Sequence, residues 1–398
     1  MNTAPLLSII VPTKDRYETL LPVLRAQLDT LDDARVEIVV QDNSAHPMPA
    51  GDFAREIDDP RVRYRHTAEA LSIVGNTVEA IEASRGEFLI FIGDDDLVSP
   101  HVMSFVEWMK RIGCEALSYS AGRYWWPTVK FDRETMYHRP GAFWLAGSHD
   151  GAARRMSARG ELDRILRIGG VNYGELPRFY HGIVSRASLE RIKARAGTYV
   201  PGASPDMAFS AALALVMDDY LYVEYPISIF GASRNSGGGM TAAGRHYGRL
   251  EDQKHLPRET VEQWDPLIPR VWSELTIYPQ TLREVGRRFG QDLSVDYDAF
   301  YASALVTEPH IWPHLKPCLA RRYGAAPWRL PRLLAQVVKK VGGRLRRAAR
   351  SSGRGGMDVE LHLFDSIGAV AGFLAGDRFR PDLEALDALQ RPASGRRA

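Results

Sequence analysis

The feature that most constrains the fold is a short apolar run at residues 88–92 (FLIFI), which follows a charged turn and leads into three consecutive aspartates. Five apolar residues without alternation are typical of an interior strand of a parallel sheet, because such a strand is buried on both faces. Side chains alternate along a strand, so Asp94 and Asp96 should point to one side and Asp95 to the other. Carboxylates are ligands that Mg²⁺ and Mn²⁺ prefer. The run therefore predicts a metal site, and a solvated acidic turn before a helix near Pro100 is the alternative.

Strand and helix patterns alternate along the first hundred residues. Apolar runs predict strands at residues 6–11, 36–40, 62–66 and 87–92, and residues 18–28 and 74–83 have helical spacing. This alternation predicts an α/β fold, with a mostly parallel sheet and helices on both faces. Ligands bind outside the carboxyl ends of the strands in such sheets. Residues 13–16, 42–44 and 94–96 each follow a predicted strand, so we expect them to converge on one edge.

The rest of the chain changes character twice. Residues 118–177 are rich in Trp, Tyr, Arg and Gly without clear periodicity, and we expect irregular structure there. Ordered patterns return at residues 178–195, in a helix after residues 204–206, and in strands at 220–225 and 227–230. Three glycines at residues 237–239 predict a flexible loop, and helical patterns follow. We therefore expect a catalytic domain at residues 1–235, and a mobile loop with a mainly helical region at 236–398.

Composition limits the setting in which this chain works. It has 398 residues, 45% of them apolar, with a net charge of +2, so its overall charge favours no class of partner. Cys114 and Cys318 lie far apart in the sequence, which fits a reducing environment. We find no signal peptide and no apolar stretch of the roughly 20 residues that cross a bilayer. We expect a cytoplasmic protein whose membrane contact, if it has any, is peripheral at the inner face.

Residues 320–357 form a basic segment, with eleven Lys or Arg residues and no acid. Within it, residues 333–341 are amphipathic enough to lie on an anionic membrane surface. The favoured alternative is a solvated helix that packs on the protein's own core. Nucleic-acid binding is a third interpretation, and the lack of a recognised module weighs against it.

Four segments in order carry a resemblance to a known family: residues 8–16 (SIIVPTKDR), 37–44 (EIVVQDNS), 75–76 (GN) and 86–96 (GEFLIFIGDDD). Together they resemble family 2 glycosyltransferases of the GT-A fold, closely as far as residue 110 and more loosely as far as residue 230. The resemblance implies that Asp96 binds Mn²⁺ or Mg²⁺, which bridges the donor diphosphate. It implies that Asp42 accepts a hydrogen bond from the base and that Asp94 faces the ribose or a metal-bound water. The remaining donor-binding residues that it implies are Pro12, Thr13, Asp15, Arg16 and Asp95.

Asp206 is the candidate general base. In a sugar transfer with inversion, a carboxylate takes the proton of the acceptor hydroxyl, and the resemblance places a downstream acid near this position. The alternative is an ordinary helix start, with Ser204 as cap and Pro205 as first residue. Asp218 and Asp219 are weaker candidates because they lie at a helix end.

Several further residues have both a functional and a structural interpretation. His181 is a candidate for the metal or the acceptor, although a lone histidine is more often a structural hydrogen bonder. Arg234 or His246 could reach the diphosphate from a mobile lid, and a flexible linker is the equal alternative. Asn76 could contact the nucleotide, but we favour a helix cap. Trp125 and Trp126 could stack on a sugar or belong to the core.

The sequence thus predicts a metal-dependent glycosyltransferase with a nucleotide-sugar donor, UDP-linked by preference. The acceptor is expected to be a hydroxyl of a glycan, a lipid-linked glycan or a small molecule. A sugar nucleotidyltransferase is one alternative, but residues 12–16 lack the glycines of its phosphate loop. A non-catalytic glycan-binding protein on the same fold is another.

Overall fold

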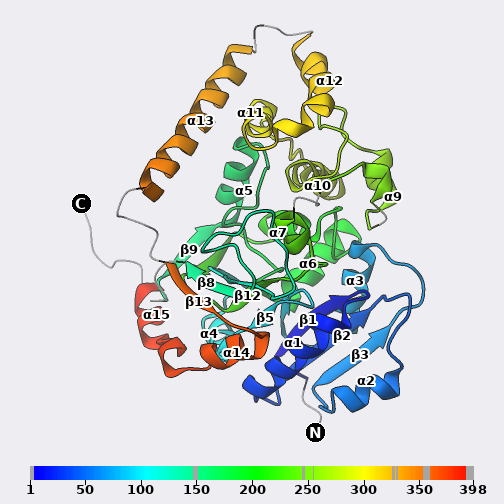
Figure 1. The fold of residues 1–398 in the computed structure, drawn as a ribbon, viewed down its shortest axis with the longest axis vertical. Coiled ribbons are helices and arrows are strands. Elements are labelled where there is room, and N and C mark those ends of the chain that lie inside the picture. Colours follow the sequence, from blue (N-terminus) through cyan, green and yellow to red (C-terminus); the bar gives the residue numbers. More distant parts are fainter. Residues whose placement is uncertain are drawn as a thin grey trace.

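The structure is a computed structural model that describes residues 4–146, 151–243, 247–253, 255–324, 328, 330–352 and 359–390. Figure 1 shows a sheet-containing region in its lower half and a group of helices above it, from α9 (Arg258–Glu262) to α13 (Leu330–Ser352).

The larger sheet holds eight strands of the described chain, in the order β3-β2-β1-β4-β10-β6-β11-β9. Their bounds are β1 (Leu7–Thr13), β2 (Val36–Asp42), β3 (Val62–His66), β4 (Phe88–Phe91), β6 (Ala116–Tyr119), β9 (Ala153–Ser157), β10 (Gly182–Ser185) and β11 (Asp219–Val223). The first four of these are parallel to their neighbours among themselves, as are β6 and β11, while β10 and β9 are antiparallel to the strands beside them. The predicted α/β architecture with a mostly parallel sheet is confirmed.

Helices cover both faces of this sheet because its central strands are apolar on both sides. Ile9 and Val11 pack into one hydrophobic cluster, and Ile10 between them packs into another. The first cluster includes side chains of α1 (Tyr17–Thr30), α2 (Ala50–Glu56) and α4 (Val102–Ile112). The second includes side chains of α3 (Ile73–Ala83), α5 (Ala158–Arg167), α6 (Arg186–Ala196) and α7 (Pro205–Val216).

A second sheet corrects the expectation of irregular structure at residues 118–177. Its order is β13-β8-β7-β12-β5, with bounds β5 (Leu97–Val98), β7 (Gly122–Trp125), β8 (Ala142–Ala146), β12 (Ser228–Ala232) and β13 (Val359–Leu363). Residues 118–177 contribute β7 and β8 here, β9 to the larger sheet, and α5. These strands are short and mix aromatic and basic residues, so their pairing partners rather than their local pattern decide their structure.

The three glycines at residues 237–239 are helical, so the prediction of a flexible loop there is wrong. They form the first turn of α8 (Gly237–Ala242), and the Ser236 side chain accepts a hydrogen bond from the Gly239 amide. A Cβ atom on Gly239 would lie 1.8 Å from the Ser233 carbonyl oxygen, so the close approach of the two segments requires glycine. His246 lies outside the described residues.

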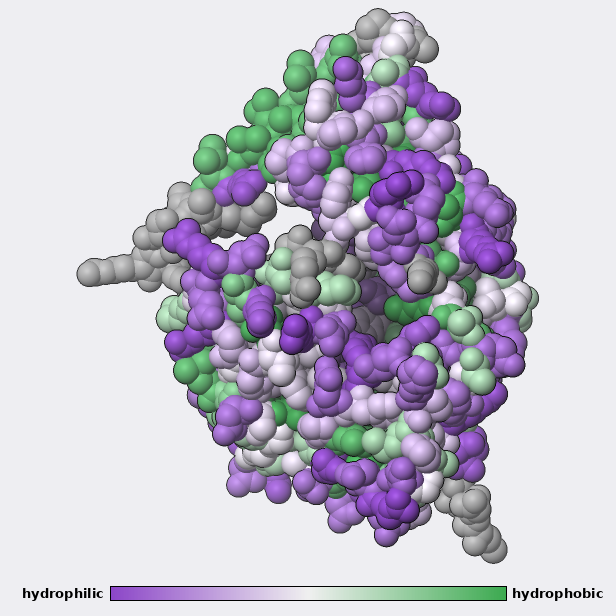
Figure 2. Space-filling model, turned by 45° about the vertical axis from the view of Figure 1, so that its right-hand side comes forward, coloured by the Kyte–Doolittle hydropathy of each residue, from purple (hydrophilic) through white to green (hydrophobic). Residues whose placement is uncertain are grey.

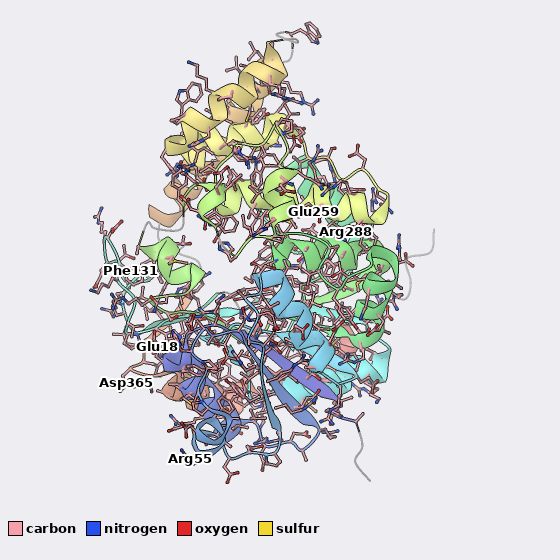
Figure 3. All side chains as sticks on the ribbon, turned by 90° about the vertical axis from the view of Figure 1, so that its right-hand side faces the viewer. Glu18, Arg55, Phe131, Glu259, Arg288 and Asp365 are labelled. Atoms are coloured by element: carbon pink, nitrogen blue, oxygen red, sulfur yellow. The ribbon has the colours of Figure 1, made fainter. Side chains whose placement is uncertain are left out.

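The C-terminal region is mainly helical, as predicted, and shares its core with the larger sheet. Its helices are η1 (Leu250–Asp252), α9, α10 (Glu274–Phe289), α11 (Tyr297–Thr307), η2 (Pro309–Ile311), α12 (Trp312–Tyr323), α13, α14 (Ile367–Leu374), η4 (Asp377–Phe379) and α15 (Leu383–Gln390). Leu282 of α10 and Phe300 of α11 lie in the same cluster as Phe209 of α7. Glu259 and Arg288 link α9 to α10 at the surface, 3.5 Å apart (Figure 3). No described helix is both long enough and apolar enough to span a membrane.

Candidate functional site

The predicted convergence of polar side chains occurs at the carboxyl ends of β1, β2 and β4. Thr13 ends β1 and lies beside Asp42 in the strand register. Its hydroxyl donates a hydrogen bond to Asp94, with 2.6 Å between the oxygens. Arg16, three residues after β1, forms an ion pair with Asp94 at 2.7 Å and lies 3.9 Å from Asp95. The end of β1 therefore holds the aspartates that follow β4.

Asp94 and Asp95 are crowded and buried, which opposes their ionisation. Burial raises the pKa of Asp94 to about 7, and the neighbouring Asp95 adds to the shift while Arg16 opposes it. Burial likewise raises the pKa of Asp95, again against the effect of Arg16. The positive charge of Arg16 therefore offsets part of the repulsion between Asp94 and Asp95 and favours their ionised forms.

Residues that follow β12 and β7 hold Asp95 from the other side. The Ser233 amide donates to the Asp95 carboxylate at 2.8 Å, and Trp126 Nε1 donates to the Asp95 carbonyl at 2.9 Å. A Cβ on Gly231 would lie only 1.6 Å from that carbonyl oxygen, so only glycine fits. Trp125 and Trp126 are both buried, which favours the core interpretation of this pair over sugar stacking.

Asp96 is fully buried and accepts four hydrogen bonds. Its Oδ2 accepts from the Gly93 amide at 2.6 Å, from His181 Nε2 at 2.9 Å and from the Tyr180 hydroxyl at 3.0 Å. Its Oδ1 accepts from the Gly231 amide at 2.7 Å. Burial acts to raise the pKa of Asp96, but His181 and the two amides hold it below its ordinary value.

The structure brings together Asp96 and His181, the two residues predicted as metal ligands. His181 has a left-handed backbone, with φ of 52°, which is rare for a residue with a side chain. Its Nδ1 lies 2.6 Å from Ser228 Oγ, and Ser228 in turn accepts a hydrogen bond from Tyr119. Strain of this kind is concentrated at functional sites.

A carboxylate and an imidazole are both ligands of Mn²⁺ and Mg²⁺ sites or of related divalent ions. In this structure Asp96 Oδ2 and His181 Nε2 are joined directly by a hydrogen bond of 2.9 Å, which a cation bound between them would replace. Among the described residues, however, no group of three or more His, Cys, Asp or Glu side chains surrounds one point. A cation here would take its other ligands from substrate and water.

Asp206 lies at the start of α7, where Ser204 is the cap residue and Pro205 the first helical residue, as expected. Burial raises the pKa of Asp206 to about 7, and the charges of Glu274 and Asp96 add to the shift. In the described part of the chain, no side chain donates a hydrogen bond to its carboxylate. Asp206 can therefore accept a proton near neutral pH, unlike Asp96, whose oxygens already have donors.

Helix α10 positions this helix start, and nothing in the local sequence indicated that it would. Glu284 accepts a hydrogen bond from the Ala203 amide at 2.8 Å, and the Thr281 hydroxyl accepts one from the Ser204 amide at 3.1 Å. Glu274, at the first residue of α10, is the largest source of like charge for Asp206. Glu274, Thr281 and Glu284 are recognised as site residues only from their contacts with a segment that is far away in the sequence.

Asp42 is fully buried, and both of its carboxylate oxygens accept hydrogen bonds. Oδ1 accepts from the amide and hydroxyl of Ser44, and Oδ2 accepts from the hydroxyls of Tyr17 and Tyr64. Burial acts to raise the pKa of Asp42, but these hydrogen bonds hold it below its ordinary value. The contacts with Ser44 are the Asx-turn geometry that such a residue often adopts. Tyr17 and Tyr64 were not predicted as site residues.

The other predicted donor-binding residues lie around this edge. Asp15 is exposed with φ of 55°, and its carboxylate accepts a hydrogen bond from the Ala45 amide at 3.1 Å. Pro12 is partly buried in β1. Arg234 is exposed, next to the Ser233 amide that binds Asp95.

Asn76 is not a helix cap, so the interpretation that we favoured is wrong. Ser72 caps α3, and its side chain accepts a hydrogen bond from the Gly75 amide. Asn76 lies inside the helix, and its amide nitrogen donates to the Thr13 carbonyl at 3.2 Å. The residue thus ties α3 to the carboxyl end of β1, which is a structural role at the edge of the site.

We compared the chain with protein-family models, with curated proteins and with solved structures. Residues 8–159 match the family model described as Glycosyl transferase family 2. No curated protein matches. Among solved structures, TarS 1-349 of S. aureus in complex with UDP-GlcNAc has 15% identity and a TM-score of 0.47, covering 91% of this chain and 97% of that one. The mannosyltransferase PcManGT of Pyrobaculum calidifontis, in complex with GDP-Man and Mn²⁺, has 14% identity and a TM-score of 0.41, covering 89% and 84%.

A longer S. aureus TarS structure has 13% identity and a TM-score of 0.43, and this chain spans half of its length. At these scores the likenesses to solved structures carry no inference about donor, metal or acceptor. The family match, in contrast, covers the carboxyl ends of β1, β2 and β4 and the aspartates at residues 94–96, although not His181 or Asp206, and it agrees with the predicted GT-A fold. Residues 8–159 of this chain therefore form a glycosyl transferase family 2 domain.

Proposed function

We propose that this enzyme moves a sugar from a UDP-sugar to a hydroxyl of a glycan, a lipid-linked glycan or a small molecule, with inversion at the anomeric carbon. The observation that carries the proposal is Asp206. This carboxylate has a pKa raised to about 7, has no side-chain donor in the described chain, and lies within electrostatic reach of Asp96. A group that is half ionised near neutral pH is suited to general base catalysis.

On the donor side, we propose that the edge formed by β1, β2 and β4 binds the nucleotide. Asp42 has a lowered pKa and is therefore ionised, so it can accept a hydrogen bond from the imide N–H of uracil. Such a bond requires the hydroxyl of Tyr17 or Tyr64 to turn away from Oδ2. Arg16 and Arg234 are the cations that we assign to the diphosphate. Arg16 is held by its contacts with Asp94 and Asp95. Thr13 donates a hydrogen bond to Asp94 and so helps to fix the segment that follows β4.

We propose that Asp96 and His181 hold Mn²⁺ or Mg²⁺ in the loaded enzyme. Such an ion stabilises the negative charge of the departing diphosphate. His181 binds a metal only when Nε2 is unprotonated, so the ring proton must then sit on Nδ1. Ser228 Oγ, 2.6 Å from Nδ1, is placed to accept it. The Tyr180 hydroxyl donates a hydrogen bond to Asp96 Oδ2 at 3.0 Å and so helps to orient this carboxylate.

On the acceptor side, we propose that the hydroxyl approaches Asp206 from the side on which α10 lies. As that oxygen forms its bond to the anomeric carbon, its proton passes to the Asp206 carboxylate. Tyr173 and Tyr278 lie close enough that the charge of Asp206 raises the pKa of each, after the larger effect of burial. The two rings pack edge to face, with their centroids 6.0 Å apart, and we assign them to the acceptor side.

The test is the substitution Asp206→Asn, with Asp218→Asn as a matched control. Asp218 lies just beyond the other end of the same helix. We expect Asp206→Asn to keep donor binding, measured by calorimetry with the UDP-sugar and Mn²⁺, and to lose at least about 10²-fold in turnover. Near-normal turnover of a folded Asp206→Asn enzyme would remove Asp206 as the base. Loss of turnover in Asp218→Asn alone would make Asp218, the weaker candidate, the base, and loss in both variants would point to a structural effect of this helix.

The nucleotide is tested separately by thermal shift with UDP, GDP, CDP and dTDP, each with and without Mn²⁺. A ligand that binds only the folded state raises the melting temperature. We expect the largest shift with UDP and Mn²⁺. A larger shift with another nucleotide would replace UDP in the proposal, and shifts that do not depend on Mn²⁺ would count against the metal.

A further inference from the structure

Helix α13 is attached to the protein along one side. Leu333 is buried in the hydrophobic cluster that also contains Phe300 of α11, and Val337 packs against this cluster. Arg332 forms an ion pair with Asp296 at 2.7 Å, and Arg344 donates to the Val306 carbonyl at 3.0 Å. The expectation that this basic segment packs on the protein's own core is correct for this side of the helix.

The flank next to this attached side carries an exposed apolar stripe. Its members are spaced four, four, three and four residues apart, so they share one face of the helix. Their exposed fractions are 42% for Leu330, 62% for Leu334, 71% for Val338, 41% for Val341 and 65% for Leu345. Figure 2 shows a continuous hydrophobic band along this helix at the upper left of the molecule. A band of this kind marks an interaction surface.

An exposed tryptophan and a uniform charge accompany the stripe. Trp328, two residues before the helix, is 74% exposed. Residues 330–352 contain seven Lys or Arg residues and no acid. Arg332 is paired with Asp296, but two copies that met through this helix would still bring together two basic segments that contain no acidic residue. The charge therefore disfavours a second copy as the occupant and favours an anionic surface.

We propose that α13 lies in the interface of an anionic lipid bilayer, with the stripe from Leu330 to Leu345 inserted below the headgroups. An apolar face, a cationic polar face and a flanking tryptophan are what an interfacial helix needs. The basic residues add attraction to anionic lipid, which falls off within a Debye length. This inference concerns where the enzyme works and does not depend on the chemistry of the sugar transfer.

The experiment is flotation of the full chain with two kinds of vesicle, one of phosphatidylcholine alone and one of phosphatidylcholine and phosphatidylglycerol mixed two to one. We expect binding to the anionic vesicles and little binding to neutral ones. The variant Leu334→Gln/Val338→Gln removes two strongly exposed members of the stripe, and we expect at least about a tenfold loss of partitioning. The variant Lys339→Gln/Arg346→Gln should weaken binding to anionic vesicles and reduce its salt dependence.

The matched control is Met136→Gln/Leu363→Gln, which changes two apolar side chains of similar exposure, 59% and 54%, elsewhere on the surface. It should bind vesicles like the unchanged protein. The proposal is overturned if the full chain ignores anionic vesicles, or if the stripe variant and this control lose the same amount. A dimer that dissociates in Leu334→Gln/Val338→Gln, without vesicle binding by the unchanged chain, would assign the stripe to a second copy instead. Equal melting temperatures of the variants establish that each is folded.

Discussion

Replacement of Asp206 should stabilise the protein while it removes activity. The pKa of Asp206 is about 7 in the folded state, against an ordinary value of 3.8. Between these two pH values the folded state holds a proton that the unfolded state has lost. Stability therefore falls as pH rises through this window. The full difference is about 4 kcal/mol, since one pKa unit corresponds to about 1.4 kcal/mol, and about 2.5 kcal/mol of it falls between pH 5 and pH 8.

Asp206→Asn has no proton to lose, so its advantage over the unchanged protein should grow by about 2.5 kcal/mol from pH 5 to pH 8. For a chain of this length that corresponds to a relative rise of about 3 °C in melting temperature. The assay is a pair of thermal melts at each pH, with EDTA and no nucleotide, and with Asp218→Asn as the control. A difference between the variant and the unchanged protein that stays constant within about 1 °C over this range would refute the assigned pKa and the burial that causes it.

Three further outcomes follow from the site. Turnover should rise with pH through about 7, as Asp206 loses its proton, and a pH–rate profile that is flat from 6 to 8 would contradict this. Gly231→Ala should destabilise the protein by more than about 2 kcal/mol in urea unfolding, because its Cβ would overlap the Asp95 carbonyl; a neutral effect would show that the two segments can separate. Trp126→Phe should cost about 1 kcal/mol or more through the lost hydrogen bond to that carbonyl, and it should lower donor affinity in calorimetry; unchanged affinity would mean that Asp95 does not depend on it.

The first four strands of the larger sheet could be predicted because each carries its own signal. Strand β3 has the predicted bounds, and the bounds of β1, β2 and β4 differ from the predicted ones by at most two residues at either end. The apolar runs of β1, β2 and β4 are buried on both faces, so their local composition and their final environment agree. The convergence of Thr13 and Asp94 followed from the same parallel order, because carboxyl ends of parallel strands meet at one edge.

What the sequence did not reveal depends on contacts between distant segments. Strand β13, near the end of the chain, pairs with β8, which lies in its first half, and no local pattern indicates that partner. Tyr17 and Tyr64 are recognisable as site residues only once β3 and α1 place both hydroxyls on Asp42. Glycines 237–239 were misread because glycine lowers helix propensity, while close packing at Ser233 decided the outcome.

Two hydrogen bonds from α10 to the residues before Asp206 join the helical region to the proposed base. Glu284 and Thr281 accept from the Ala203 and Ser204 amides, so Asp206 takes its position from residues much further along the chain. Leu282 and Phe300 also share a hydrophobic cluster with Phe209 of α7, so a polypeptide that ended at residue 235 would expose this cluster as well as lose the support of Asp206. The C-terminal helices can therefore diverge only as far as these contacts and this pair of hydrogen bonds allow.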